Sequence, residues 1–292
     1  MAFNNTSLAI LQDGKVMVWG ENKGQLGIES DSNIDRPTEI LELSNAKKVV
    51  LGASYIIGIM EDGRILACGV NTDGIIGFTA SETIERPIEV TSLADVKDII
   101  SGVDCTMVLF NSGILKIWGT KYYSQFGYNI PEDKNSPLTI EGLSGLKQIA
   151  NGSGYTLALL QNGSILGWGD NYLNQLGIQG SGKIIEPKRV ESLASVKSIS
   201  SSKDHTVAVM ESGNIKVWGS NESGKIGLSD SANKMEPTNV EGISNVKEGY
   251  AGSNFTILLM EDGTLKSCGN NDNGQLGINE KVGRSVFTNI QI

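Results

Sequence analysis

The 292-residue sequence has few of the side chains that most often carry catalysis or bind metals. It contains one histidine and three cysteines. Those cysteines match neither a disulfide framework nor a zinc-ligand spacing, and no Cys, Asp or Glu stands at ligand spacing from the histidine. We therefore expect no metal site, and we expect buried, unreactive thiols in a reducing compartment.

Long apolar runs and long basic runs are also missing. No uninterrupted apolar stretch approaches the ~20 residues that a membrane span needs, and the N-terminal MAFNNTSLAILQDG lacks the basic and apolar regions of a signal peptide. The net charge of −9 and the absence of Lys/Arg runs argue against electrostatic binding to nucleic acid or anionic lipid. We expect a cytoplasmic protein without membrane insertion and without a nucleic-acid partner.

Glycine, by contrast, is abundant and regularly spaced. The chain has 36 glycines, and one that closes a predicted hairpin turn recurs six times, first after 49 residues and then every 50, at Gly14, Gly63, Gly113, Gly163, Gly213 and Gly263. A fixed period of this size indicates a solenoid, a propeller or an array. The repeats run over about residues 1–45, 46–95, 96–145, 146–195, 196–245 and 246–292.

Each repeat predicts four short antiparallel strands. Residues 206–227 (TVAVMESGNIKVWGSNESGKIG) show the central hairpin, because apolar residues alternate on both sides of Ser212-Gly213. After the hairpin comes a strand that begins near a proline, and before it comes a short strand that ends in small residues. We place the short strand innermost, because small residues suit the crowded backbones around the central axis of a ring. The prediction is an all-β fold: a six-bladed β-propeller of four-stranded antiparallel blades forming a single domain over 1–292.

The first blade has little sequence for its innermost strand. Only Met1 to Thr6 come before the first hairpin. Two alternatives follow: Met1-Ala2-Phe3 supplies an abbreviated strand, or a neighbouring chain fills the gap, which would produce self-association or assembly through the incomplete blade.

The repeats resemble the regulator of chromosome condensation repeat. The resemblance lies in the hairpin followed by W-G-x-N-x-x-G-Q-L-G, best preserved at residues 7–27, 156–177, 206–227 and 256–277, with weaker copies at 57–77 and 107–127. It implies a propeller, although the best-known members have seven blades. The best-characterised member is a nucleotide exchange factor that uses an inserted wedge and a basic tail, whereas this chain is acidic and its complete repeats are of one length.

The residues that could act in catalysis all have structural explanations. His205 occupies a repeat position that holds Tyr55 and Tyr155 elsewhere, so we interpret it as a residue packed between strands rather than as a general base. The stretch GENKGQLG predicts turns rather than a phosphate loop, because no helix follows it. Hairpin-turn carboxylates such as Glu61 and Glu261 fall on separate blades. We predict that the protein is not an enzyme and has no cofactor.

Differences between repeats are the places to look for binding. The third and fourth repeats carry aromatic residues in the loops after the strand that ends in Trp-Gly. Aromatics in loops on a rigid scaffold are typical interface anchors. We predict that Tyr122, Tyr123, Tyr128 and Tyr172 bind a protein partner; ordinary loop packing is the alternative.

Three functions fit the sequence. The first is a non-catalytic protein-interaction or recognition propeller of bacterial or phage type, suggested by Ile-, Asn- and Lys-rich composition and uniform repeats. The second is a virion surface or tail component that recognises host or neighbouring proteins and would lie in the virion. The third is a guanine nucleotide exchange factor for a small GTPase. The acidic charge favours a basic or neutral partner.

Overall fold

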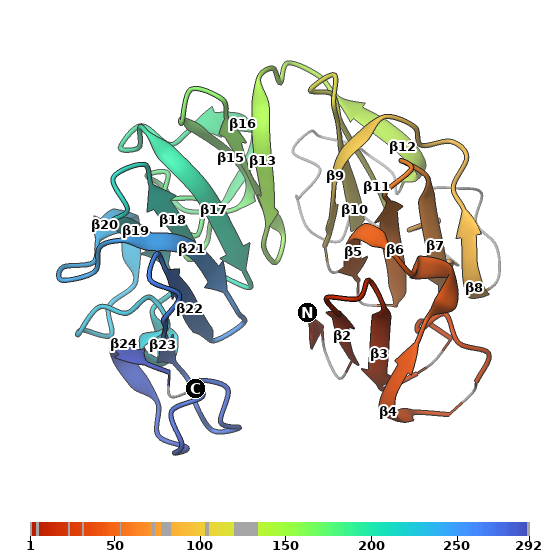
Figure 1. The fold of residues 1–292 in the computed structure, drawn as a ribbon. Coiled ribbons are helices and arrows are strands. Elements are labelled where there is room, and N and C mark those ends of the chain that lie inside the picture. Colours follow the sequence, from red (N-terminus) through yellow and green to blue (C-terminus); the bar gives the residue numbers. More distant parts are fainter. Residues whose placement is uncertain are drawn as a thin grey trace. The chain divides into compact units, whose positions relative to one another are not determined.

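The computed structural model describes residues 2–3, 6–22, 24–30, 32–52, 54–71, 74–76, 83–102, 105–119 and 134–290. These residues form six four-stranded antiparallel sheets, and the strands of each sheet follow one another in sequence order (Figure 1). Each sheet falls within one predicted repeat. The fold class is the predicted one: all-β, with six four-stranded blades of a β-propeller.

The chain divides into two compact units, each with three of the sheets. Unit 1 comprises Met1–Tyr122 and Ile130–Ser144. Its strands are β1 (Ala2–Phe3), β2 (Thr6–Ile10), β3 (Val16–Gly20), β4 (Ile34–Glu39), β5 (Ala46–Leu51), β6 (Tyr55–Met60), β7 (Ile65–Gly69), β8 (Ile84–Glu89), β9 (Val96–Ser101), β10 (Cys105–Phe110), β11 (Leu115–Gly119) and β12 (Lys134–Ile140).

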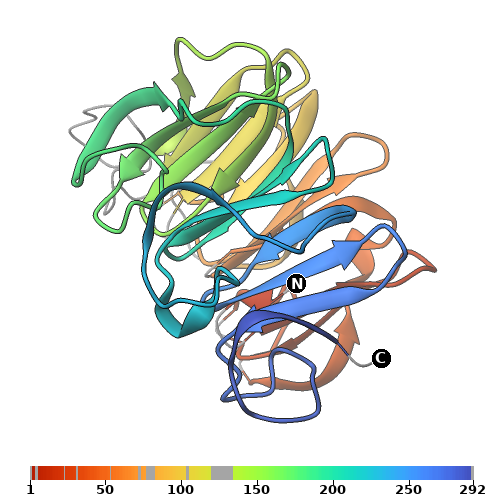
Figure 2. The same cartoon turned by 90° about the vertical axis from the view of Figure 1, so that its left-hand side faces the viewer.

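Unit 2 comprises Tyr123–Asn129 and Gly145–Ile292. Figure 2 shows its sheets from the side. Its strands are β13 (Leu146–Asn151), β14 (Tyr155–Leu160), β15 (Ile165–Asp170), β16 (Lys183–Arg189), β17 (Val196–Ser202), β18 (His205–Met210), β19 (Ile215–Gly219), β20 (Lys234–Asn239), β21 (Val246–Ala251), β22 (Phe255–Met260), β23 (Leu265–Gly269) and β24 (Arg284–Asn289).

The predicted hairpins form because the turn glycine adopts a left-handed conformation. Gly213 has φ +79°, its N–H donates to the Met210 carbonyl at 2.9 Å, and the Met210 N–H donates to the Asn214 carbonyl at 2.9 Å. Glycine adopts such a positive φ without steric cost, because it has no Cβ. The repeat glycines therefore fix the position of each turn and, with it, the register of the strands on either side.

The hydrophobic core lies between neighbouring blades of one unit. Val207 and Val209 of β18 pack with Val246 and Leu258 of the next blade. Strands β6, β14 and β18 are buried along nearly their whole length. A hairpin between two blades thus buries both faces, and apolar residues at successive positions replace strict alternation.

In five of the blades, the first strand contacts its equivalent in a neighbouring blade of the same unit. In unit 1, β5 contacts β9; in unit 2, β17 contacts both β13 and β21. This arrangement agrees with the prediction that the short strand ending in small residues is innermost. The first blade is completed by β1, which is only two residues long and pairs Ala2 with Ser7 and Phe3 with Thr6. The abbreviated-strand alternative is therefore confirmed.

Helical structure in the described residues is limited to short 3-10 turns, such as η1 (Leu41–Leu43) and η3 (Glu222–Gly224). Within the same residues, no helix has the length and apolar character of a membrane span.

Candidate functional site

The only histidine is fully buried between two blades. His205 Nε2 lies 3.0 Å from Thr256 Oγ1 of the next blade. Burial, together with the positive charge of Lys225, lowers the pKa of His205 to about 3, so the imidazole is neutral at physiological pH. The residue is packed between strands, as predicted, with its side chain fully buried.

The same repeat position carries equivalent inter-blade hydrogen bonds elsewhere. The Tyr155 hydroxyl donates to the His205 carbonyl at 2.9 Å, and the Tyr55 hydroxyl donates to the Cys105 carbonyl at 3.1 Å. Both tyrosines are fully buried. Their role, like that of His205, is to satisfy polar groups where one blade meets the next.

A buried ion pair lies beside His205. Lys225 Nζ is 2.5 Å from Asp204 Oδ1, with the lysine side chain fully buried and the carboxylate nearly so. Lys225 stands where the first, fourth and sixth repeats have Gln25, Gln175 and Gln275. This position holds no charged residue in the first, second, fourth and sixth repeats, the second having Ile75. The charge of Lys225 is tolerated because Asp204 neutralises it inside the fold.

The glycine-rich stretches are loops closed by a buried asparagine. In the fourth repeat, Asn171 Oδ1 accepts from the Leu176 N–H at 3.0 Å, while its Nδ2 donates to the carbonyls of Ile178 and Gly180 at 2.8 and 2.7 Å. Asn71, Asn221 and Asn271 accept in the same way from the residue five positions on. The stretch forms a turn, as predicted.

The hairpin-turn carboxylates also have local partners. Asp62 Oδ1 accepts from the Arg64 N–H at 3.0 Å, and Asp262 Oδ1 accepts from the Thr264 N–H at 2.9 Å. The Arg64 N–H lowers the pKa of the Asp62 carboxyl, and the Thr264 hydroxyl, followed by the Thr264 N–H, lowers that of Asp262. The carboxylates stabilise their own turns, and they belong to different units.

The cysteines are all free and buried. Desolvation raises the pKa of the Cys68 thiol to about 12 and raises that of Cys268 as well. A thiol that stays protonated is a poor nucleophile, so the prediction of buried, free thiols is confirmed for all three. Across the residues described above, no group of three His, Cys, Asp or Glu side chains is placed to hold a metal ion.

The structure places one of the four predicted partner-binding tyrosines. Tyr172 lies in the loop between β15 and β16 and is 60% exposed, and its neighbour Leu173 is 40% exposed. Tyr122, Tyr123 and Tyr128 lie outside the described residues. Tyr172 is thus available to a partner, and its binding role stays a prediction.

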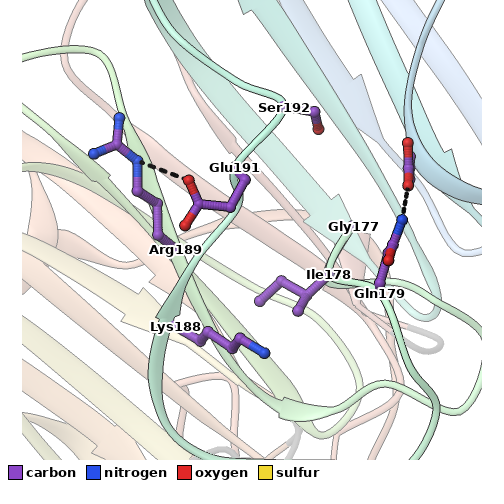
Figure 3. Close-up of a pocket in the computed structure, with 8 residues that line it drawn as sticks. Gly177, Ile178, Gln179, Lys188, Arg189, Glu191 and Ser192 are labelled. Atoms are coloured by element: carbon purple, nitrogen blue, oxygen red, sulfur yellow. Dashed lines mark hydrogen bonds and ion pairs between the residues drawn. The ribbon is translucent and has the colours of Figure 1, made fainter.

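One hollow of about 380 Å³ opens between the fourth and fifth blades of the chain, both of which belong to unit 2 (Figure 3). Its polar side chains have local partners: Arg189 Nε lies 3.9 Å from Glu191 Oε2, and the Gln179 amide donates to Glu236 Oε1 at 2.6 Å. Figure 3 shows Lys188 apart from both pairs. The lining carries charges of both signs, with two basic residues (Lys188 and Arg189) and two acidic ones (Glu191 and Glu236).

A larger hollow of about 560 Å³ lies over the innermost strands of unit 2. It is lined by Lys147, Lys197 and Lys247, which are equivalent residues of three successive blades, and by Tyr250. The site is absent from the sequence-based predictions. Its signal in the sequence is a lysine that recurs at intervals of 50 residues, whereas the predicted partner-binding residues are all aromatic.

These blades define a β-propeller scaffold in which buried polar groups hold the blades together and exposed positions vary. Over residues 2–291 the chain matches the model of the RCC1-like domain. The chain therefore belongs to the RCC1-like domain family, as its repeats predicted.

Solved structures show the same fold at low sequence identity. Yeast RCC1 (Prp20), solved bound to Kap60, is 21% identical with a TM-score of 0.84; the match covers 98% of this chain and 73% of that one. Prp20p from Saccharomyces cerevisiae, described with its binding properties to Gsp1p and histones, is 21% identical with a TM-score of 0.82 over 98% and 75%. Human WBSCR16 is 19% identical with a TM-score of 0.84 over 99% and 80%.

Proposed function

We propose that the protein is a non-catalytic recognition propeller that binds a protein partner through exposed positions that differ between repeats. The observation that carries this proposal is a division of roles among its polar and aromatic side chains. His205, Tyr155 and Lys225 are fully buried and hydrogen-bonded between or within blades, whereas Tyr172 is 60% exposed in a loop. A rigid scaffold with an exposed aromatic loop suits recognition.

The proposed setting is bacterial or phage, either in the cytoplasm or as a virion surface or tail component. The support is the Ile-, Asn- and Lys-rich composition and the near-constant 50-residue period. Nucleotide exchange on a small GTPase is a second candidate, favoured by the fold likeness to yeast RCC1. It predicts that substoichiometric amounts of the protein accelerate nucleotide release from a GTPase partner.

The recognition proposal is tested by affinity capture from the native host, followed by binding measurements with the purified partner. Replacing Tyr172 by alanine is expected to weaken the partner's binding by roughly tenfold or more, because exposed aromatic anchors in a loop carry a large share of interface energy.

The matched control is Met235→Ala, which truncates a 55%-exposed apolar side chain on β20. We expect it to change the dissociation constant less than about twofold. Equal affinity for wild type and Tyr172→Ala would remove Tyr172 from the interface. Failure of any captured protein to bind as a purified component would contradict the recognition function itself.

A further inference from the structure

The innermost strands of unit 2 share a β-bulge, and each bulge carries a lysine. Along β13 the strand pairing passes from Leu146 directly to Gln148, so Lys147 has no cross-strand partner. The pairing of β17 skips Lys197 and that of β21 skips Lys247 in the same way. Bulges re-aim a side chain relative to the sheet, so three blades present an ammonium group at one equivalent point.

Unit 1 repeats this arrangement. The pairing of β5 skips Lys47, and the pairing of β9 skips Lys97. Five blades therefore place lysine at the bulge of the innermost strand, in a chain whose net charge is −9. Local positive charge at a repeated, geometrically fixed position contrasts with the acidic character of the chain as a whole.

In unit 2 the bulge lysines line the 560 Å³ hollow, whose floor is held by hydrogen bonds between blades. The Gln148 side chain bonds both the N–H and the carbonyl of Ile199, at 3.0 and 2.9 Å. Ser200 Oγ accepts from the Ala251 N–H at 3.0 Å. These bridges fix neighbouring innermost strands to one another, so the lysines project from a preorganised surface.

Two of the three lysines lean toward glutamates of the following blade. Lys147 Nζ lies 3.6 Å from Glu211 Oε1, and Lys197 Nζ lies 3.3 Å from Glu261 Oε1. Both glutamate side chains are more than half exposed, and exposed pairs of this kind contribute little energy. The two glutamates hold the ammonium groups of Lys147 and Lys197 apart, and the carboxylates of a partner can easily replace them. Lys247 is exposed and forms no ion pair with the described residues of unit 2.

Tyr250 adds an aromatic surface to the hollow. It occupies the position that holds Ala150 and Ser200 in the preceding blades, and it is 50% exposed. Its hydroxyl donates to a carboxylate oxygen of Glu248. One rim of the hollow therefore offers an aromatic ring beside the lysines, a combination typical of protein interfaces.

We propose that this hollow binds an acidic segment of a protein partner, whose carboxylates pair with Lys147, Lys197 and Lys247 while its backbone passes Tyr250. The separate positions of the ammonium groups, one for each blade, fit several carboxylates along an extended chain better than a single small anion. This inference rests on the proposed recognition function and assigns it a partner class, opposite to the basic or neutral partner that net charge alone favours.

The test measures binding of a fluorescein-labelled peptide rich in Glu and Ser to the full chain by fluorescence polarisation. A triple variant (Lys147→Gln, Lys197→Gln, Lys247→Gln) is expected to bind roughly tenfold or more weakly. The matched control (Lys183→Gln, Lys203→Gln, Lys281→Gln) removes the same charge elsewhere in unit 2 and is expected to stay within about twofold. Both variants are compared with wild type by circular dichroism to show that they are folded.

A second variant is expected to strengthen peptide binding instead of weakening it. Glu211→Gln with Glu261→Gln releases two lysines from their partners and is expected to tighten peptide binding by about threefold.

Equal weakening by the two lysine triples, or no saturable binding by the wild type, would overturn the inference. So would displacement of the peptide by millimolar inorganic phosphate as effectively as by unlabelled peptide, because that result assigns the hollow to small anions. If the acidic peptide fails while the captured partner still binds in a Tyr172-dependent way, this inference is wrong and the recognition function stands.

Discussion

Replacing Trp218 by alanine is expected to lower the free energy of unfolding by about 3–5 kcal/mol. Trp218 is fully buried and packs with Leu157, Leu159 and Ile199 of the preceding blade and its own innermost strand. Its indole N–H donates to the Gln175 carbonyl at 2.9 Å. Truncation would leave a cavity between two blades and remove one of the donors to that carbonyl.

The measurement is urea unfolding followed by tryptophan fluorescence and circular dichroism. Tyr172→Ala serves as the control, because that aromatic side chain is mostly exposed and its loss is expected to change stability by less than about 0.5 kcal/mol. A loss of under about 1 kcal/mol for Trp218→Ala would contradict the claim that inter-blade packing holds unit 2 together.

Replacing Lys225 by methionine is expected to cost a similar amount, about 3–5 kcal/mol. The substitution keeps the length and apolar stem of the side chain but removes its charge. Asp204, whose side chain is only 8% exposed, would then be left as a buried carboxylate without its cation. The penalty of an uncompensated buried charge is larger than the worth of the pair itself.

A double substitution separates the penalty of the uncompensated charge from the net contribution of the ion pair. Asp204→Asn with Lys225→Gln replaces the ion pair by neutral groups and restores the glutamine of Gln25, Gln175 and Gln275. We expect the double variant to recover most of the stability lost in Lys225→Met, to within about 1 kcal/mol of wild type. If the double variant were as unstable as the single one, the ion pair would be a required part of the fold rather than a compensated exception.

The architecture could be predicted from the sequence because each blade is encoded by a similar pattern of turn glycines and apolar strand residues. Turn glycines such as Gly213 recur at intervals of 49 or 50 residues, and each adopts the positive φ that a hairpin turn requires. The apolar alternation, the turn glycines and the family resemblance all indicated the same four-stranded blade. A fold can be predicted from sequence when such independent signals agree. The burial of His205 followed from its place in the repeat.

The candidate binding surface was less accessible to sequence analysis. A β-bulge is a property of strand pairing, so nothing within one repeat indicates that Lys147 or Lys197 stands outside the register. The partnership of Asp204 with Lys225 joins residues 21 positions apart in the sequence, across a hairpin whose geometry fixes their approach. Tyr250 is not among the predicted partner-binding residues because it lies on strand β21, whereas that prediction was restricted to aromatic residues in loops.

The central claim is that recognition uses exposed ends of the blades while the buried polar groups only hold the scaffold together. Hydrogen exchange of the protein with and without its purified partner tests this most directly. We predict that binding slows exchange in the loop of Tyr172 or at the first residues of β13, β17 and β21, and leaves the β14 and β18 amides unchanged. Protection confined to the outer strands β16, β20 and β24, or chemical conversion of the partner during incubation, would contradict the claim.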